Sequence, residues 1–279
     1  MKLSNFKHAT ITKRPSAYCK TPYVADIILD DGTVALAHCP ALGCCGLSDK
    51  NSHVIVVPLE SEKTKCQYRV ELSVINKNIE NETIVGINPK NAEYIMYEML
   101  SRNECPFLNV KTYAREKKML NSRFDFMGVE KDDTNFIMEI KNVPLADHVD
   151  VPKKERKKYN TENMPYNEKI AYFPDGYRKN STAVVSPRAL KHIEELEIIK
   201  KDDPKTRAIL CFTVPRHDVN VFQPSNIDLT YKAAVQKAWL NGVEIHAVQV
   251  IWNNFGICQF VKCLPVVLFD THGPYFMDK

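Results

Sequence analysis

Three charged side chains fall on two neighbouring segments that have the pattern of a β-hairpin. Asp125 interrupts the apolar segment 123–129, and Glu139 and Lys141 lie two residues apart in the segment 135–143. Because side chains alternate between the two faces of a strand, Glu139 and Lys141 share a face. With the turn centred midway between Asp125 and Glu139, the two carboxylates lie opposite each other, with Lys141 beside them.

Such a set suits metal-dependent hydrolysis of a phosphodiester. Two carboxylates at close range repel each other unless a divalent cation lies between them, and Mg²⁺ or Mn²⁺ accepts oxygen ligands of this kind. The backbone carbonyl of Ile140 could add a third ligand. Lys141 would position the attacking water or stabilise charge on the phosphorus oxygens. The structural alternative is a solvated salt-bridge ladder, which the apolar residues flanking Asp125 argue against.

The spacing Asp-x13-Glu-x-Lys resembles the signature of PD-(D/E)XK nucleases, with Phe124 in place of the leading proline. Many such nucleases use a further carboxylate from a preceding helix. Apolar residues at helical spacing predict a helix over residues 91–102, with Asn91 as its N-cap and Glu98 as the candidate carboxylate. The alternative for Glu98 is a solvent-facing helix residue.

The elements that must position this set divide the chain into two domains. Residues 1–78 show only extended, β-branched segments separated by turn signals, the pattern of a small barrel. Helical periodicity begins after Gly86, and further helices are predicted over residues 186–199 and 229–240, between apolar strands. We therefore expect an all-β barrel domain over residues 1–78, followed by a mixed α/β domain over 79–279.

Many residues match, in the same order, those of the sugar fermentation stimulation protein family, which the chain resembles along nearly its whole length. The matches include Ala37-His-Cys-Pro40 with Gly43, Ser122-Arg-Phe-Asp-Phe126, Glu139-Ile-Lys-Asn-Val143, Ala171-Tyr-Phe-Pro-Asp175 and Arg188-x-x-Lys-His-x-x-Glu-Leu196. The resemblance implies an N-terminal OB-fold-like barrel followed by a restriction-endonuclease-like, PD-(D/E)XK α/β domain. It also implies DNA binding, and the fold suggests nuclease chemistry.

Basic residues near the hairpin are candidates for contact with a nucleic-acid backbone. Three lie at or before the first strand of the hairpin. The other three lie on the predicted helix 186–199, two of them adjacent and the third one turn earlier. The candidates are Lys117, Lys118, Arg123, Arg188, Lys191 and His192. Charge runs are often merely solvated surface, so both interpretations stay open.

Two functions are consistent with these residues. The first is a metal-dependent DNA nuclease, and the second is a DNA-binding transcriptional regulator that keeps the nuclease fold without cutting. The intact set of Asp125, Glu139 and Lys141 favours the first, and DNA is favoured over RNA. Strand type, direction of cleavage, base preference and oligomeric state are not indicated.

Composition narrows the class of protein further. The 279 residues are 44% hydrophobic with a formal net charge of +4, which excludes disorder over the whole chain. No apolar run is long enough to span a membrane, and the first residues lack the apolar core of a secretory signal. Nine cysteines without framework spacing indicate reduced thiols in an intracellular compartment, cytoplasmic or, in a eukaryotic host, nuclear. Cys39, Cys44 and Cys45 fit no zinc template, and Cys105 and Cys211 lack partners for thiol catalysis.

Overall fold

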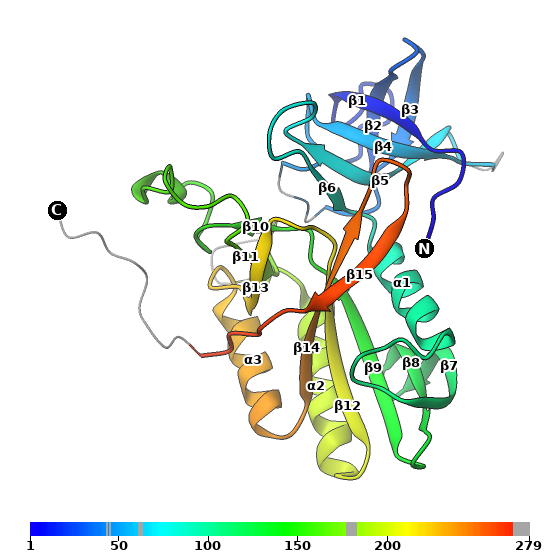
Figure 1. The fold of residues 1–279 in the computed structure, drawn as a ribbon, viewed down its shortest axis with the longest axis vertical. Helices are drawn as coiled ribbons and strands as arrows, with labels where there is room; N and C mark the ends of the chain where they lie inside the picture. Colours follow the sequence, from blue (N-terminus) through cyan, green and yellow to red (C-terminus); the bar gives the residue numbers. More distant parts are fainter. Residues whose placement is uncertain (43, 45, 61–63, 177–182, 270–279) are drawn as a thin grey trace.

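The computed structural model describes the chain except residues 43, 45, 61–63, 177–182 and 270–279 (Figure 1). Its first six strands form one sheet. They are β1 (Lys7–Lys13), β2 (Val24–Leu29), β3 (Val34–His38), β4 (His53–Pro58), β5 (Tyr68–Ile75) and β6 (Thr83–Gly86). The order is β3-β2-β1-β4-β5-β6, and a parallel pairing of β3 with β5 closes the first five strands into a barrel. This is the strand connectivity of an OB-fold, so the expected barrel is confirmed.

The barrel sheet continues past residue 78 because β6 pairs with β5. Gly86 then joins the two domains. Its N–H donates to the Pro215 carbonyl at 3.0 Å, and a Cβ at this position would lie 2.8 Å from the Cβ of Pro215. Only glycine permits so close an approach. We propose that the domain boundary lies directly after Gly86 rather than at residue 78.

The second domain is built on a mixed six-stranded sheet of order β15-β14-β12-β9-β8-β7. The three central strands β9, β12 and β14 are parallel, and the outer ones are antiparallel to their neighbours. Its strands are β7 (Val110–Met119), β8 (Ser122–Glu130), β9 (Asn135–Asn142), β12 (Arg207–Val214), β14 (Glu244–Trp252) and β15 (Cys258–Cys263). The expected mixed α/β domain is therefore confirmed.

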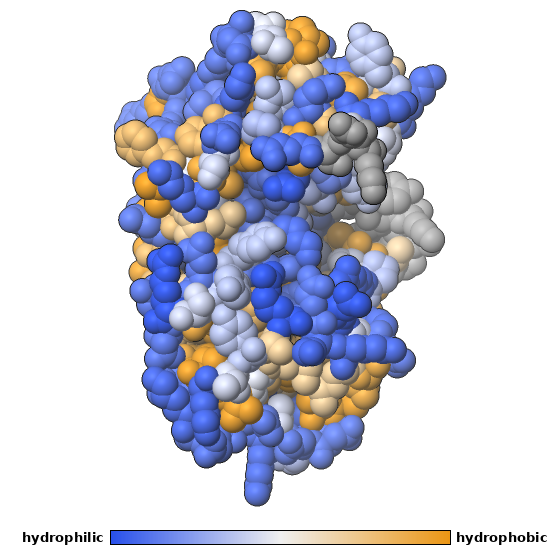
Figure 2. Space-filling model, turned by 90° about the vertical axis from the view of Figure 1, so that its right-hand side faces the viewer, coloured by the Kyte–Doolittle hydropathy of each residue, from blue (hydrophilic) through white to orange (hydrophobic). Residues whose placement is uncertain are grey.

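Helices cover both faces of this sheet (Figure 1). The helix α1 (Pro89–Ser101) packs on one face, and α2 (Pro187–Asp202) and α3 (Leu229–Leu240) pack on the other. A smaller sheet joins β10 (Ala146–Asp147), β11 (Lys169–Phe173) and β13 (Val219–Pro224), and Arg156–Lys158 form a 3-10 turn. Figure 2 shows the side of the molecule that carries α1 and β7, where hydrophilic side chains cover most of the surface.

The start of α1 differs from the expectation. Its N-cap is Asn88, whose side chain accepts a hydrogen bond from the Lys90 N–H at 3.1 Å. Pro89 begins the helix earlier than predicted, because proline is favoured at the first helical position. Asn91 instead lies inside the first turn and donates to the buried Glu71 of the barrel at 2.9 Å.

Six of the eight described cysteines are buried, as apolar core residues are. Cys39 and Cys44 are buried in the barrel core, and Gly43 and Cys45 lie outside the described residues. Burial raises the pKa of the Cys105 thiol to about 11 and raises that of Cys211, so neither is a ready thiolate. In the described part of the chain, no helix is long and apolar enough to cross a bilayer.

Candidate functional site

The strands β8 and β9 form the predicted hairpin. Phe126 pairs with Met138, so the next pair along the ladder places Asp125 opposite Glu139. The Ile140 N–H donates to Asp125 Oδ2 at 2.7 Å. The structure therefore brings the two carboxylates together across the hairpin, as their spacing predicts.

Asp125 lies at a local irregularity of β8. Phe124 and Phe126 are both fully buried, but Phe124 packs in the core under α2 and α3, and Phe126 packs in the core under α1. In a regular strand, residues two apart share a face, so β8 is rotated at Asp125. On the facing strand β7, Glu116 lies opposite Asp125 and has a left-handed φ of 49°. The irregularity turns the Asp125 carboxylate toward Glu139 while two aromatic rings shield it.

Glu139 is 3% exposed and lies between two nitrogen donors. Its Oε1 accepts from Lys141 Nζ and from His192 Nδ1, which are 3.4 Å apart. Because a carboxylate only accepts, the Nδ1 of His192 must carry a proton. The other oxygen, Oε2, is buried, and none of the described residues gives it a hydrogen bond. One acceptor of this carboxylate is thus left for a ligand.

The two carboxylates differ in charge state. Burial, and then the charge of Glu139, raises the pKa of Asp125 to about 7. Burial alone would also raise the pKa of Glu139, but Lys141 and His192 outweigh it and lower that pKa. A carboxyl with a raised pKa beside an ionised one is the arrangement that a bound cation relieves most.

The structure does not bring Glu98 to this cluster. Glu98 pairs with the amino group of Met1 at 2.8 Å and with Arg102 at 3.0 Å. Glu93, on a different side of α1, is the helix carboxylate whose charge reaches Asp125 and helps to raise its pKa. The sequence already distinguished Glu93 from Glu98, because side chains five residues apart on a helix point to different faces. Sequence reasoning chose the wrong glutamate.

The six basic candidates separate into three groups. Lys117 and Lys118 are exposed on β7, and Arg123 pairs with Glu116 at 3.3 Å. On α2, Lys191 donates to the Asn121 carbonyl at 2.6 Å, whereas Arg188 is exposed. His192 is 3% exposed and contacts Glu139, so its expected contact with nucleic acid stays a prediction. It belongs to the wall of the carboxylate cluster.

Sequence reasoning missed a tyrosine near the same cluster. Tyr231 of α3 is fully buried, and its hydroxyl has no hydrogen-bond partner. Burial, with the nearby charge of Glu139, raises the pKa of this hydroxyl. No local pattern marks Tyr231, since α3 meets the hairpin only in the tertiary structure.

The donor set suits a hard divalent cation. Asp125 and Glu139 supply oxygen ligands, and Mg²⁺ is commonly held by one or two carboxylates together with water and substrate phosphate. Among the described residues, no three histidine, cysteine or acidic side chains already converge as a ligand set. The protein thus offers a partial shell, in which the unpartnered Oε2 of Glu139 is the clearest free ligand.

This geometry lies within the segment that matches a known family. The model described as "Sugar fermentation stimulation protein RE domain" matches residues 90–255, which include α1, the hairpin and α2. The chain belongs to the sugar fermentation stimulation protein family. The restriction-endonuclease-like character expected for the second domain agrees with this match and with the mixed sheet.

Relatives in this family align along most of the chain. A sugar fermentation stimulation protein homolog of Trichodesmium erythraeum is 29% identical over 251 residues, covering 86% of this chain and 87% of the relative. One from Desulfotalea psychrophila is 25% identical and covers 92% of each. The structure of Pyrococcus furiosus SfsA in complex with Ca²⁺ has the same fold. Its TM-score is 0.75 at 17% identity, covering 96% of this chain and 98% of the other.

Proposed function

We propose that this member of the sugar fermentation stimulation protein family is a Mg²⁺- or Mn²⁺-dependent nuclease that hydrolyses phosphodiester bonds of DNA. The observation that carries the proposal is the buried pair of Asp125 and Glu139, with one unpartnered carboxylate oxygen and Lys141 alongside. Asp125 and Glu139, with the Ile140 carbonyl, would hold the ion. A related protein of the same fold was solved with Ca²⁺, which supports a divalent site here.

Each side chain has a distinct task in this proposal. The cation, when bound, lowers the pKa of a water ligand and stabilises charge on the phosphate. Lys141 orients the attacking water or donates to a phosphate oxygen as negative charge grows there. His192 holds Oε1 of Glu139 through its Nδ1 proton, so that Oε2 keeps its direction. Asp125 accepts from the Ile140 N–H, which fixes its position against Glu139.

The test is a cleavage assay on labelled single- and double-stranded DNA with Mg²⁺, with Mn²⁺ and with a chelator. Cleavage should need the metal. Asp125→Asn and Lys141→Ala should each lower the rate by at least a hundredfold, because they remove a metal ligand and a charge-stabilising group. DNA binding should persist in both variants.

Two outcomes decide between the candidate functions. Strong binding without cleavage under either metal would favour the non-cutting regulator. Cleavage that survives Asp125→Asn unchanged would show that the reaction occurs elsewhere on the chain.

The two glutamates of α1 give a matched pair of variants. Glu93→Gln should slow cleavage by several-fold to tenfold and raise the metal concentration needed, because its charge acts on Asp125. Glu98→Gln should leave both quantities unchanged, because Glu98 pairs with Met1 and Arg102. Equal effects from the two substitutions would contradict this assignment.

Backbone contact is the expected source of affinity for DNA. Replacing Lys117, Lys118 and Arg123 together with alanine should weaken binding and flatten its dependence on salt by up to about three counterions. Binding titrations at several salt concentrations measure this slope. An unchanged slope would place the DNA away from β7 and the hairpin.

A further inference from the structure

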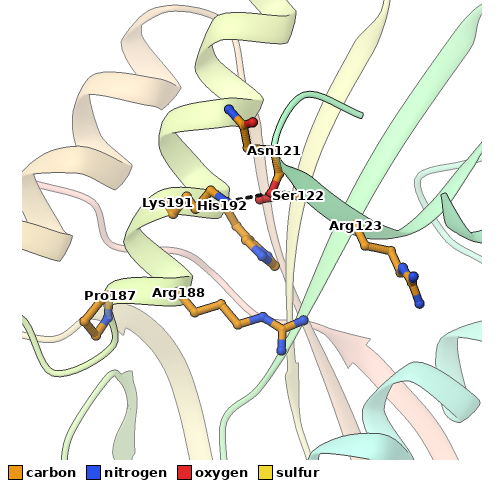
Figure 3. A pocket seen from close by; sticks show the side chains of 7 residues that line it. All are labelled: Asn121, Ser122, Arg123, Pro187, Arg188, Lys191 and His192. Carbon is orange, nitrogen blue, oxygen red and sulfur yellow. Dashed lines mark hydrogen bonds between the residues drawn. The ribbon is translucent and has the colours of Figure 1, made fainter. Parts of the chain in front are cut away.

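A hollow opens beside the carboxylate cluster, between the first turns of α2 and the start of β8 (Figure 3). His192 forms the wall that the hollow shares with the cluster, because it also contacts Glu139 and Lys141. The lining residues are Asn121, Ser122, Arg123, Pro187, Arg188, Lys191 and His192. A strand of nucleic acid at the carboxylates would pass directly by this hollow.

The three cations of the lining are not equivalent. Lys191 is held by the Asn121 carbonyl, and Arg123 points away from α2 toward its partner Glu116 on β7 (Figure 3). Arg188 extends from α2 into the middle of the hollow, and among the described residues no hydrogen bond or ion pair holds its guanidinium. A free guanidinium is suited to bidentate contact with phosphate oxygens.

Ser122 supplies an independent sign of a ligand. It is 6% exposed and lines the hollow, yet its Oγ is buried and has no hydrogen-bond partner in the described part of the chain. Leaving a buried hydroxyl unpaired is unfavourable, because its hydrogen bonds to water are lost without replacement. An oxygen-rich ligand in the hollow would satisfy this group.

The surrounding charges favour an anion. The 16-residue helix α2 begins at the hollow, capped by Ser186, and its N-terminus carries partial positive charge. On α2, Glu195 lies 3.8 Å from Lys191 and is balanced by it. Arg188 is thus left as an uncompensated positive charge at the opening.

We propose that this hollow is a phosphate-binding subsite, in which Arg188 and the Ser122 hydroxyl hold a phosphate group of the nucleic-acid strand adjacent to the one that is cleaved. Its placement on the substrate strand rests on the proposed function, but binding there does not require cleavage. The phosphate can be a terminal phosphomonoester or an internal phosphodiester, which offer the same oxygens to Arg188.

The experiment measures binding rather than cleavage. In an Asp125→Asn background with a chelator, the affinity is measured for oligonucleotides that carry a 5′-phosphate or a 5′-hydroxyl. Arg188→Ala should weaken binding about tenfold, the loss expected for a charge-assisted hydrogen-bonded pair. Arg188→Lys should restore part of it. A loss confined to the 5′-phosphorylated strand identifies a terminal phosphate, and an equal loss on both identifies an internal one.

Ser122→Ala separates a ligand-binding role from a structural one. Because the wild-type hydroxyl is unpaired, its removal should leave the melting temperature unchanged or raised, while affinity falls several-fold. Lys205→Ala, which removes an exposed cation at the other end of α2, is the matched control and should bind like its parent.

The outcomes for the two proposals are separable. Arg188-dependent binding without any metal-dependent cleavage would contradict the nuclease proposal and support the phosphate site. Metal-dependent cleavage with parental affinity in both Arg188→Ala and Ser122→Ala would overturn the phosphate site alone. Absence of any binding to either oligonucleotide would also overturn it.

Discussion

Two sites with buried carboxylates in the second domain differ in how completely the protein supplies their hydrogen-bond and charge partners. Asp218 is fully buried and accepts two hydrogen bonds from Arg216, both at 2.7 Å, and one from Lys169 at 2.6 Å. Burial would raise the pKa of Asp218, but Arg216 and Lys169 together hold it at about 2. At the hairpin, Glu139 keeps an unpartnered oxygen, and the pKa of Asp125 rises to about 7.

This difference distinguishes a cluster with a structural role from one that forms a ligand site. At Asp218 both carboxylate oxygens have cationic partners inside the protein, and Arg216 also donates to the Pro144 carbonyl at 2.6 Å. The Asp218 cluster therefore needs no ligand to compensate its carboxylate. At Asp125 and Glu139 the protein carries an uncompensated acid that costs stability, and such costs are typical of sites kept for a ligand.

The largest effect should come from breaking the saturated cluster. Asp218→Asn removes the negative charge that compensates the buried Arg216 and the partly buried Lys169, and should lower the free energy of unfolding by about 3–5 kcal/mol. Urea denaturation measures the change.

Asp31→Asn is the matched control in the barrel. Asp31 also has a pKa lowered to about 2 but pairs with Lys7 on the exposed surface at 3.3 Å, so no measurable change is expected. Equal losses in the two variants would show that burial does not distinguish them.

The dependence of stability on pH should reveal the unsaturated cluster. The folded pKa of Asp125, about 7, lies above its ordinary 3.8, so its contribution is fully present below pH 4 and is lost as the pH rises through 7. The loss is at most about 4 kcal/mol. In a chelator, Asp125→Asn should therefore gain stability over the wild type between pH 4.5 and 8.

The titration of Asp218 does not affect the comparison of the wild type with Asp125→Asn between pH 4.5 and 8. Its lowered pKa gives a contribution that is present above pH 4 and is lost only as the pH falls through 2. Parallel unfolding profiles of the wild type and Asp125→Asn over pH 4.5–8 would be evidence against an uncompensated carboxyl at the hairpin.

A divalent cation should recover part of this loss. At pH 8 and a hundredfold excess over its dissociation constant, Mn²⁺ or Mg²⁺ should stabilise the wild type by about 2.7 kcal/mol. Thermal melts with and without the metal measure the shift, and Asp125→Asn should show little of it. The same shift in both proteins would place the cation elsewhere.

The sequence was informative wherever a local pattern fixes the geometry. The alternation along residues 135–142 predicted that Glu139 and Lys141 share a face, and the equal distance of Asp125 and Glu139 from the turn predicted their pairing. The barrel, the mixed sheet and the helices α2 and α3 followed from periodicity.

The errors arose where the decisive contact lies between distant segments. Periodicity placed Glu98 on α1 but could not show that the chain's first residue reaches it, which leaves Glu93 as the acid of α1 that acts on Asp125. The helix 186–199 gave no sign of which face meets the hairpin, so His192 was predicted as a nucleic-acid contact and its contact with Glu139 was not foreseen.

The sequence by itself determined the identities and order of the chemical groups: two acids and a lysine on one hairpin, and a basic helix start further along. Only the tertiary structure decided which of these groups are satisfied. Hydrogen bonding and burial depend on contacts across more than 50 residues, such as that of His192 with Glu139. Among the described residues, Oε2 of Glu139, the Ser122 hydroxyl and the Arg188 guanidinium are left without hydrogen-bond partners, as is the Tyr231 hydroxyl. The packing of α2 on the hairpin engages other groups instead, such as Lys191 with the Asn121 carbonyl.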